Sequence, residues 1–240
     1  DAEVLRVVQA EACRPFDLAA GPLIRCRLFR LAEADHLLSV TVHHIVADGQ
    51  SMEIIRRELS SLYTAFRHNR AVSLPVLPLQ YVDVAAWQRR QVGSDVQRRQ
   101  LEFWRGRLDG VPPLLTLPWD YSRPAVQGHR GARYSWTISP ATGERLQALG
   151  RRYRVTPFML LLSAFALLLS RYSGQTDFCI GTPVANRGRR ESQALVGCFV
   201  NTVALRMALG GNPLLSDFLR QVRKTVLEAQ AHQELPFERL

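Results

Sequence analysis

The sequence predicts an α/β fold, because segments typical of strands alternate with segments typical of helices along its 240 residues. The stretch "LLSVTVHH" alternates polar and apolar residues, which is typical of a half-buried strand. Directly after it, apolar residues recur at spacings of three and four from Met52 to Phe66, which is typical of an amphipathic helix. With 47% hydrophobic residues, the chain is long enough to bury a sizeable core.

The first part of the chain predicts two strands and three helices after a short helical start. "GPLIRCRLFRL" and "HLLSVTVHH" are the two strands, separated by the polar "AEAD". A helix is expected from about Ser51, and two more at about 80–92 and 94–108. Gly93 divides the last two helices, and Ser94 is a candidate cap.

The regular pattern is lost over "DGVPPLLTLPWDYSRPAVQG", and we interpret this run as a crossing between two lobes. The predicted organisation is therefore a first lobe at 1–110, a crossing at 111–131 and a second lobe at 132–240. The second lobe is expected to open with a strand, "ARYSWTIS", and a helix begun by Pro140. A long buried helix, "FMLLLSAFALLL", then begins at Pro157, and two strands and a last helix follow it.

Composition and charge exclude several classes of protein. The net charge of +10 could indicate an acidic partner, but all basic residues except Lys224 are arginines and no aromatic-interleaved basic motif is present, so nucleic-acid binding is not expected. The longest apolar run is too short to span a bilayer, and no secretory signal opens the chain. The four cysteines lack the spacing of metal ligands or of a disulfide framework, which indicates a reducing compartment. We therefore expect a cytoplasmic protein without membrane association.

The candidate site lies in "HHIVADG", where the strand meets the helix. His44 continues the apolar face of the strand and His43 points the opposite way. An imidazole can take or share a proton near neutral pH. Asp48 follows in a turn that Gly49 can enter with positive φ, and this carboxylate could orient the ring, cap the helix or pair with an arginine.

Structural alternatives exist for the same residues. A lone histidine on an apolar face is often a core side chain satisfied by hydrogen bonds, and an Asp-Gly pair can simply begin a helix. A metal site is not expected, because adjacent histidines on a strand project to opposite faces and cannot easily share one ion.

"HHIVADGQS" resembles the HHxxxDG motif of the condensation domains of nonribosomal peptide synthetases, members of the chloramphenicol acetyltransferase-like superfamily. The blocks around it are similar to those of this family and stand in the same order, among them "YVDVAAWQRR", "IGTPVANR" and "GCFVNTVALR". The resemblance implies a two-lobed fold with mixed sheets flanked by helices. It also implies that the chain is incomplete at both ends, with the C-terminal part of the N-lobe and the N-terminal part of the C-lobe present. Such a part is expected to leave sheet edges and apolar surface uncovered.

The resemblance further implies amide-bond formation between two carrier-bound substrates. His44 is the catalytic candidate, either as general base or as the group that orients the amine and steadies the tetrahedral intermediate, with His43 beside it. Asp48 is expected to hold the turn through an arginine salt bridge, and Gly49 to allow the close approach of backbone and substrate. No cofactor is expected to bind directly, because phosphopantetheine is presented by upstream and downstream peptidyl carrier proteins. An adenylation domain is the expected neighbour.

The second set of candidates is expected to bind substrate. Asn201 shares a strand face with Phe199 and Val203, so its amide must find hydrogen-bond partners, either from the backbone or beside the substrate channel. Gly181 and Thr182 belong to the "IGTPVANR" block, although its glycine and proline could reflect turn chemistry alone. Cys198 is interpreted as a small apolar residue rather than a nucleophile.

Three related functions compete with amide-bond formation. Epimerization relatives carry a glutamate-bearing block where this chain has "VANRGRRESQALVG", and heterocyclization relatives replace both histidines. Non-catalytic relatives that dock carriers or recruit other enzymes tend to lose the paired histidines. Because both histidines are intact, the sequence favours a peptide-bond-forming acyltransferase.

Overall fold

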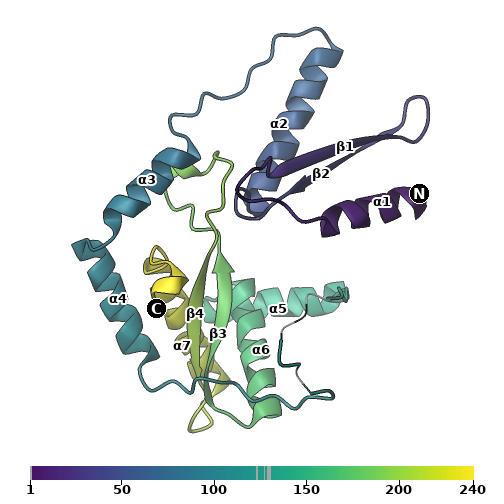
Figure 1. The fold of residues 1–240 in the computed structure, drawn as a ribbon. Coiled ribbons are helices and arrows are strands. Elements are labelled where there is room, and N and C mark those ends of the chain that lie inside the picture. Colours follow the sequence, from purple (N-terminus) through teal and green to yellow (C-terminus); the bar gives the residue numbers. More distant parts are fainter. Residues whose placement is uncertain (1, 123, 127, 129–130) are drawn as a thin grey trace. The chain divides into compact units, whose positions relative to one another are not determined.

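The computed structural model divides into two compact units, which are described one at a time (Figure 1). It describes residues 2–122, 124–126, 128 and 131–240. Unit 1 and unit 2 each combine two stretches of chain, namely Asp1–Val92 with Ala185–Val200 and Gly93–Val184 with Asn201–Leu240.

The bounds of these units differ from those of the predicted lobes. Residues 93–110 cluster with unit 2, whereas the segment 185–200, which connects two strands of unit 2 along the chain, clusters with unit 1. The predicted division of the whole domain into lobes remains a prediction. Four residues of its crossing at 111–131, namely 123, 127, 129 and 130, lie outside the described residues.

The described part of unit 1 contains an antiparallel hairpin and three α-helices, which correspond to the predicted helical start, the two predicted strands and the first two of the three predicted helices after them. These elements are α1 (Ala2–Cys13), β1 (Ile24–Arg30), β2 (His36–Val42), α2 (Gly49–Arg67) and α3 (Tyr81–Gln91). The strands pair from Ile24 opposite Val42 to Arg30 opposite His36. A short 3₁₀ helix, Arg190–Ser192, lies in the segment 185–200.

The hairpin stops pairing just before the site. Its last hydrogen bond on this side runs from the N–H of His43 to the carbonyl oxygen of Leu23 at 3.0 Å. In this register the residue opposite His44 is Pro22, which has no N–H to donate. The prediction that His44 continues the apolar face of the strand was therefore wrong, because His44 lies in a turn and is exposed.

Helix α2 buries only one narrow face within unit 1. Ser51 and Ile54 are buried. Much of the apolar stripe from which the helix is predicted is open to solvent, and Phe66 at its far end is 70% exposed. This exposure matches the expectation that a part of a larger domain leaves apolar surface uncovered.

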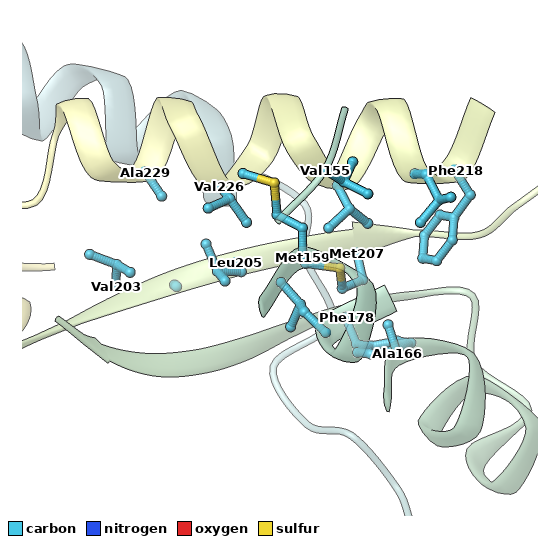
Figure 2. Close-up of a cluster of buried hydrophobic side chains, with 14 of the residues drawn as sticks. Val155, Met159, Ala166, Phe178, Val203, Leu205, Met207, Phe218, Val226 and Ala229 are labelled. Atoms are coloured by element: carbon cyan, nitrogen blue, oxygen red, sulfur yellow. The ribbon is translucent and has the colours of Figure 1, made fainter. Parts of the chain in front are cut away.

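The described part of unit 2 contains four α-helices and a second antiparallel pair of strands. These elements are α4 (Asp95–Leu108), α5 (Pro140–Tyr153), α6 (Pro157–Ser173), β3 (Asp177–Val184), β4 (Asn201–Ala208) and α7 (Leu215–Ala231). Helix α7 lies along β4, and the core side chains fill the space between them (Figure 2). That core includes Val203, Leu205, Met207, Phe218, Val226 and Ala229.

Helix α6 has the predicted start but not the predicted full burial. Thr156 caps it, with its hydroxyl oxygen accepting a hydrogen bond from the N–H of Met159 at 3.3 Å, and Pro157 is its first residue. One face is buried in the core, whereas the opposite face is exposed at Phe158, Leu161, Phe165, Leu168 and Tyr172. Within the described ranges, no single helix has the length and apolar composition to cross a bilayer. Helices α5 and α6 reach that length and composition only when they are counted together, and they are bent by 101° at their junction.

The strand predicted at "ARYSWTIS" is absent, and that prediction was wrong. Residues 131–139 are irregular, and Tyr134 and Trp136 are largely exposed. The alternating pattern is present in the sequence, but a strand also needs a hydrogen-bonded neighbour. The described residues offer none to this segment.

Candidate active site

The segment between β2 and α2 is a turn closed at both ends by hydrogen bonds. The N–H of Val46 donates to the carbonyl oxygen of His43 at 3.1 Å. At the other end Asp48 caps α2, because its Oδ1 accepts a hydrogen bond from the N–H of Ser51 at 2.8 Å. Asp48 therefore begins the helix, which was one of its predicted roles.

Gly49 is the first residue of α2 and does not need the freedom of glycine there. Its φ is not positive, so the prediction that it enters the turn with positive φ was wrong. A Cβ placed on it would meet no described atom within 4 Å. Close approach of a substrate, as the resemblance implies, remains the reason to expect glycine at this position.

Asp48 also forms a buried ion pair with Arg187. Their side chains are 6% and 2% exposed, and Nη2 of Arg187 lies 2.9 Å from Oδ1 and 3.1 Å from Oδ2 of Asp48. Oδ2 accepts a second hydrogen bond, from the N–H of Phe199 at 3.1 Å. The arginine partner expected for Asp48 therefore comes from the end of the "IGTPVANR" block, 139 residues away.

The pKa of Asp48 is held below its ordinary value. Burial opposes ionisation, but the N–H of Ser51, the Arg187 guanidinium, the Ser51 hydroxyl and the N–H of Phe199 together outweigh it. Asp48 is therefore a carboxylate at neutral pH. Both of its oxygens are used by structural partners.

Arg187 contacts several parts of the segment 185–200. Its Nη1 donates to the carbonyl oxygens of Ser192 at 2.6 Å and Leu195 at 2.7 Å. Its guanidinium carbon lies 4.1 Å from the centroid of the Phe199 ring. One buried cation thus joins the start and the end of this segment to Asp48.

Ser51 and Tyr81 fix the backbone at Gly197 and Cys198. Oγ of the fully buried Ser51 accepts a hydrogen bond from the N–H of Gly197 at 3.0 Å. The Tyr81 hydroxyl donates to the carbonyl oxygen of Cys198 at 2.8 Å. A Cβ on Gly197 would lie 2.1 Å from the Tyr81 ring, so only glycine allows this approach. Four of these site residues were not predicted from the sequence, namely Arg187, Ser51, Gly197 and Tyr81. Only Ser51 carried a signal in the sequence, because it stands three residues after an aspartate that can cap a helix.

His44 is exposed, and its Nδ1 lies 3.7 Å from Sγ of Cys198. Burial, reinforced by the charge of Asp48, raises the pKa of the Cys198 thiol. The thiol is therefore protonated at neutral pH and is not activated as a nucleophile, in agreement with the sequence interpretation.

His43 has a different environment from His44. Its Nδ1 accepts a hydrogen bond from the N–H of Ile45 at 3.1 Å, and its ring packs edge-on against Phe16 at 5.8 Å between centroids. The guanidinium carbon of Arg25 lies 3.6 Å from the centre of the Phe16 ring, and Arg25 in turn pairs with the buried Glu11. His43 therefore anchors the turn, and only His44 presents an exposed ring.

The histidines and Asp48 are not assembled as metal ligands. In the part of the chain that the structure describes, no group of three or more His, Cys, Asp or Glu side chains could hold an ion. The four cysteines are free thiols.

The other predicted site residues lie in unit 2. Asn201 begins β4, and its Nδ2 donates to the carbonyl oxygens of Gln233 and Leu235, both at 2.7 Å. Its Oδ1 accepts a hydrogen bond from the N–H of Phe237 at 3.1 Å. Asn201 thus fastens the segment 233–237 to the sheet, which corresponds to the backbone-satisfied alternative.

Gly181 and Thr182 are neighbours on β3 and lie opposite Ala204 and Val203 of β4. Successive side chains of a strand project to opposite faces, so Thr182 shares a face with Asn201 and Gly181 lies on the other. The structure therefore brings Thr182 and Asn201 together on one face of the sheet but not Gly181.

Comparisons with known proteins agree with the predicted family. The condensation domain family model matches residues 1–240. One of the linear gramicidin synthase proteins of Brevibacillus parabrevis is 46% identical over 240 residues, which cover 100% of this chain and 3% of that protein. Phosphinothricin tripeptide synthetase PhsC of Streptomyces viridochromogenes is 46% identical over 239 residues, which cover 100% of this chain and 22% of that protein.

Solved structures share the fold. A chain in the complex of the X-domain and OxyB from teicoplanin biosynthesis aligns with a TM-score of 0.88 at 32% identity, covering 99% of this chain and 53% of that chain. The predicted α/β fold of the family is confirmed. The chain spans about half of that solved domain and only a small share of the curated relatives. With its HHxxxDG turn built as described, the chain belongs to the condensation domain family of nonribosomal peptide synthetases.

Proposed function

We propose that this chain catalyses amide-bond formation between two substrates held by carrier proteins. The amine nitrogen of an aminoacyl thioester on the downstream carrier attacks the carbonyl carbon of an acyl or peptidyl thioester on the upstream carrier. A C–N bond forms and the C–S bond breaks. The proton lost by the amine ends on the released phosphopantetheine thiol, so the reaction needs no further reactant. An adjacent adenylation domain would load the acceptor.

The observation that carries this proposal is the exposed ring of His44 beside a buried, fully engaged Asp48. A ring that is open to solvent can reach a reacting group, whereas a paired and buried carboxylate cannot. The hydrogen-bonded turn positions the imidazole. His44 is therefore the proposed catalytic residue. His43 and Asp48 are proposed to shape the turn that presents it, and Gly49 to let the substrate approach closely.

The chemical demand on His44 is modest. An α-amine is partly unprotonated near neutral pH, and a thioester is an activated acyl donor. Holding the two in line supplies a large part of the acceleration. A positioned base or hydrogen-bond donor would add a factor on the order of 100 to 10,000.

Residues of unit 2 are proposed to assist binding. Gly181 and Thr182 are proposed to contribute to substrate binding through the β3 end of the "IGTPVANR" block. Asn201 is proposed to act indirectly, since its amide already fastens the segment 233–237. The free thiols support a reducing compartment, and we propose that the reaction takes place in the cytoplasm.

The test is a condensation assay with the full protein and purified carrier proteins. Donor and acceptor are loaded on their carriers, and the elongated carrier-bound product is detected by mass spectrometry. We expect His44→Ala to lose most turnover while remaining folded. His36→Ala, which removes an exposed imidazole at the start of β2, is the matched control. Wild-type rates of product formation by His44→Ala would overturn the proposal.

A second candidate function is the docking of a partner enzyme or carrier without catalysis. The similarity to a chain from a complex of the X-domain with OxyB favours it. The condensation assay distinguishes the two functions. No product from loaded carriers, together with equal carrier binding by wild type and His44→Ala, would favour docking. Inversion of a carrier-bound residue without elongation would instead indicate epimerization.

A further inference from the structure

We infer that Cys198 is a positioning residue for His44: its thiol holds the Nδ1 side of the ring and leaves Nε2 as the protonated nitrogen that meets the substrate. This inference rests on the proposed function, because it assigns to Cys198 the task of setting the state of the proposed catalytic ring. It departs from the sequence interpretation of Cys198 as an apolar filler.

Cys198 and His44 are in direct contact. Sγ of Cys198 lies 3.7 Å from Nδ1 of His44, which is within hydrogen-bonding reach for sulfur. The two residues are 154 positions apart in the sequence, but both belong to unit 1. Because Nδ1 faces the sulfur, Nε2 is the ring nitrogen left for a reacting group.

Hydrogen bonds on both sides of Cys198 hold its backbone beside the ring. The N–H of Gly197 before it is bound by Ser51, and the N–H of Phe199 after it is bound by Asp48. The carbonyl oxygen of Cys198 itself accepts the Tyr81 hydroxyl. Asp48 therefore affects the position of His44 indirectly in two ways. It caps the helix that follows the turn, and it binds the backbone N–H next to Cys198.

The protonation state of the Cys198 thiol decides which partner donates in this contact. The thiol is neutral at neutral pH, because burial and the charge of Asp48 raise its pKa. A neutral thiol is a weak donor and an even poorer acceptor, whereas an unprotonated imidazole nitrogen accepts readily. The favoured arrangement is therefore S–H donating to Nδ1, and the neutral ring then carries its proton on Nε2.

This tautomer selects between the two roles considered for His44. A ring protonated on Nε2 donates a hydrogen bond from that nitrogen, so it can bind the oxygen of the tetrahedral intermediate as negative charge develops there. It cannot at the same time accept the amine proton at Nε2. Cys198 thus favours stabilisation of the intermediate over general-base catalysis.

The experiment compares Cys198→Ala and Cys198→Ser in the full chain labelled with ¹⁵N-histidine. His44→Ala identifies the ring signals of His44, whose ¹⁵N shifts report which nitrogen carries the proton. We expect the Nε2–H form in wild type and in Cys198→Ser, which retains a donor, and a mixture of tautomers in Cys198→Ala. In the carrier assay, Cys198→Ala should lower kcat about threefold to tenfold with unchanged KM, the size expected for one weak hydrogen bond, and Cys198→Ser should restore most of it.

The control is Cys26→Ala, which removes an exposed thiol from β1. It should change neither the ring signals nor turnover. Wild-type signals and kcat in Cys198→Ala, with His44→Ala inactive, would overturn this inference and leave the proposed function intact. Wild-type turnover by His44→Ala would instead overturn the proposed function. If Cys198→Ala folds poorly, Cys198→Ser decides: a mixture of tautomers in that variant also overturns the inference.

Discussion

Arg187 and Asp48 form a buried ion pair in which one guanidinium nitrogen lies 2.9 Å and 3.1 Å from the two carboxylate oxygens. The pair joins the helix cap after the His-His turn to a segment 139 residues further along the chain. Its charges are also satisfied by backbone groups, among them the N–H of Phe199 and the carbonyl oxygen of Leu195. This relationship makes the turn sensitive to any change that leaves one charge alone.

Replacing Asp48 by alanine should destabilise unit 1 strongly. The change would leave the Arg187 guanidinium buried without its counter-ion, a situation that costs about 3–5 kcal/mol, and would remove the cap of α2. We expect a large loss of soluble protein and a lower melting temperature for what remains. Glu53→Ala, which removes an exposed carboxylate from α2, should change little. A folded Asp48→Ala protein of normal stability but without activity would show that this carboxylate acts in catalysis.

Acid should weaken unit 1 through the same carboxylate. The folded-state pKa of Asp48 lies below its ordinary value because the N–H of Ser51 and the Arg187 guanidinium outweigh the effect of burial. The contribution of the Asp48 carboxylate to the free energy of unfolding is therefore fully present above the ordinary aspartate pKa of about 3.9. It is lost as the pH falls through the lower pKa that Asp48 has in the folded protein. Denaturant unfolding followed from neutral pH to about pH 3 should show this decline. An Asp48→Asn protein should show a smaller decline, and an equal one would exclude Asp48 as its source.

Gly197 should tolerate no side chain. An alanine Cβ would lie 2.1 Å from the Tyr81 ring, so either the ring or the segment carrying Cys198 must move. We expect Gly197→Ala to lower the melting temperature and to reduce turnover, because both the contact of Cys198 with His44 and the Tyr81 hydrogen bond depend on that backbone.

Gly188 offers a matched comparison in the same segment. A Cβ there meets no described atom within 4 Å, and its φ is not positive. Gly188→Ala should therefore behave like wild type in both measurements. Similar losses in the two variants would mean that the segment 185–200 resists any substitution, rather than that Gly197 makes a specific close approach.

The local features of this fold could be predicted from the sequence, whereas the partners of the site residues could not. Periodicity places α2, and a threonine-proline pair places the start of α6, because both signals act within one helical turn. The strand predicted at residues 132–139 is absent. Its alternating pattern can be read within the segment, but the partner strand that it would need lies elsewhere in the chain and cannot be read from that pattern. Likewise, the family resemblance implies an arginine partner for Asp48, but only the folded backbone selects Arg187 among the many arginines of the chain.

The open environment of Gly49 allows a role in substrate approach to be tested without a change in folding. Its backbone is helical and the space around it is open, so Gly49→Ala should fold normally and can be compared with wild type directly. If this glycine lets the substrate approach the turn, the added methyl group should raise KM or lower kcat in the carrier assay without lowering the melting temperature. Full activity of a normally folded Gly49→Ala protein would show that no reacting group passes close to this Cα. Loss of both stability and activity would contradict the open environment of this residue.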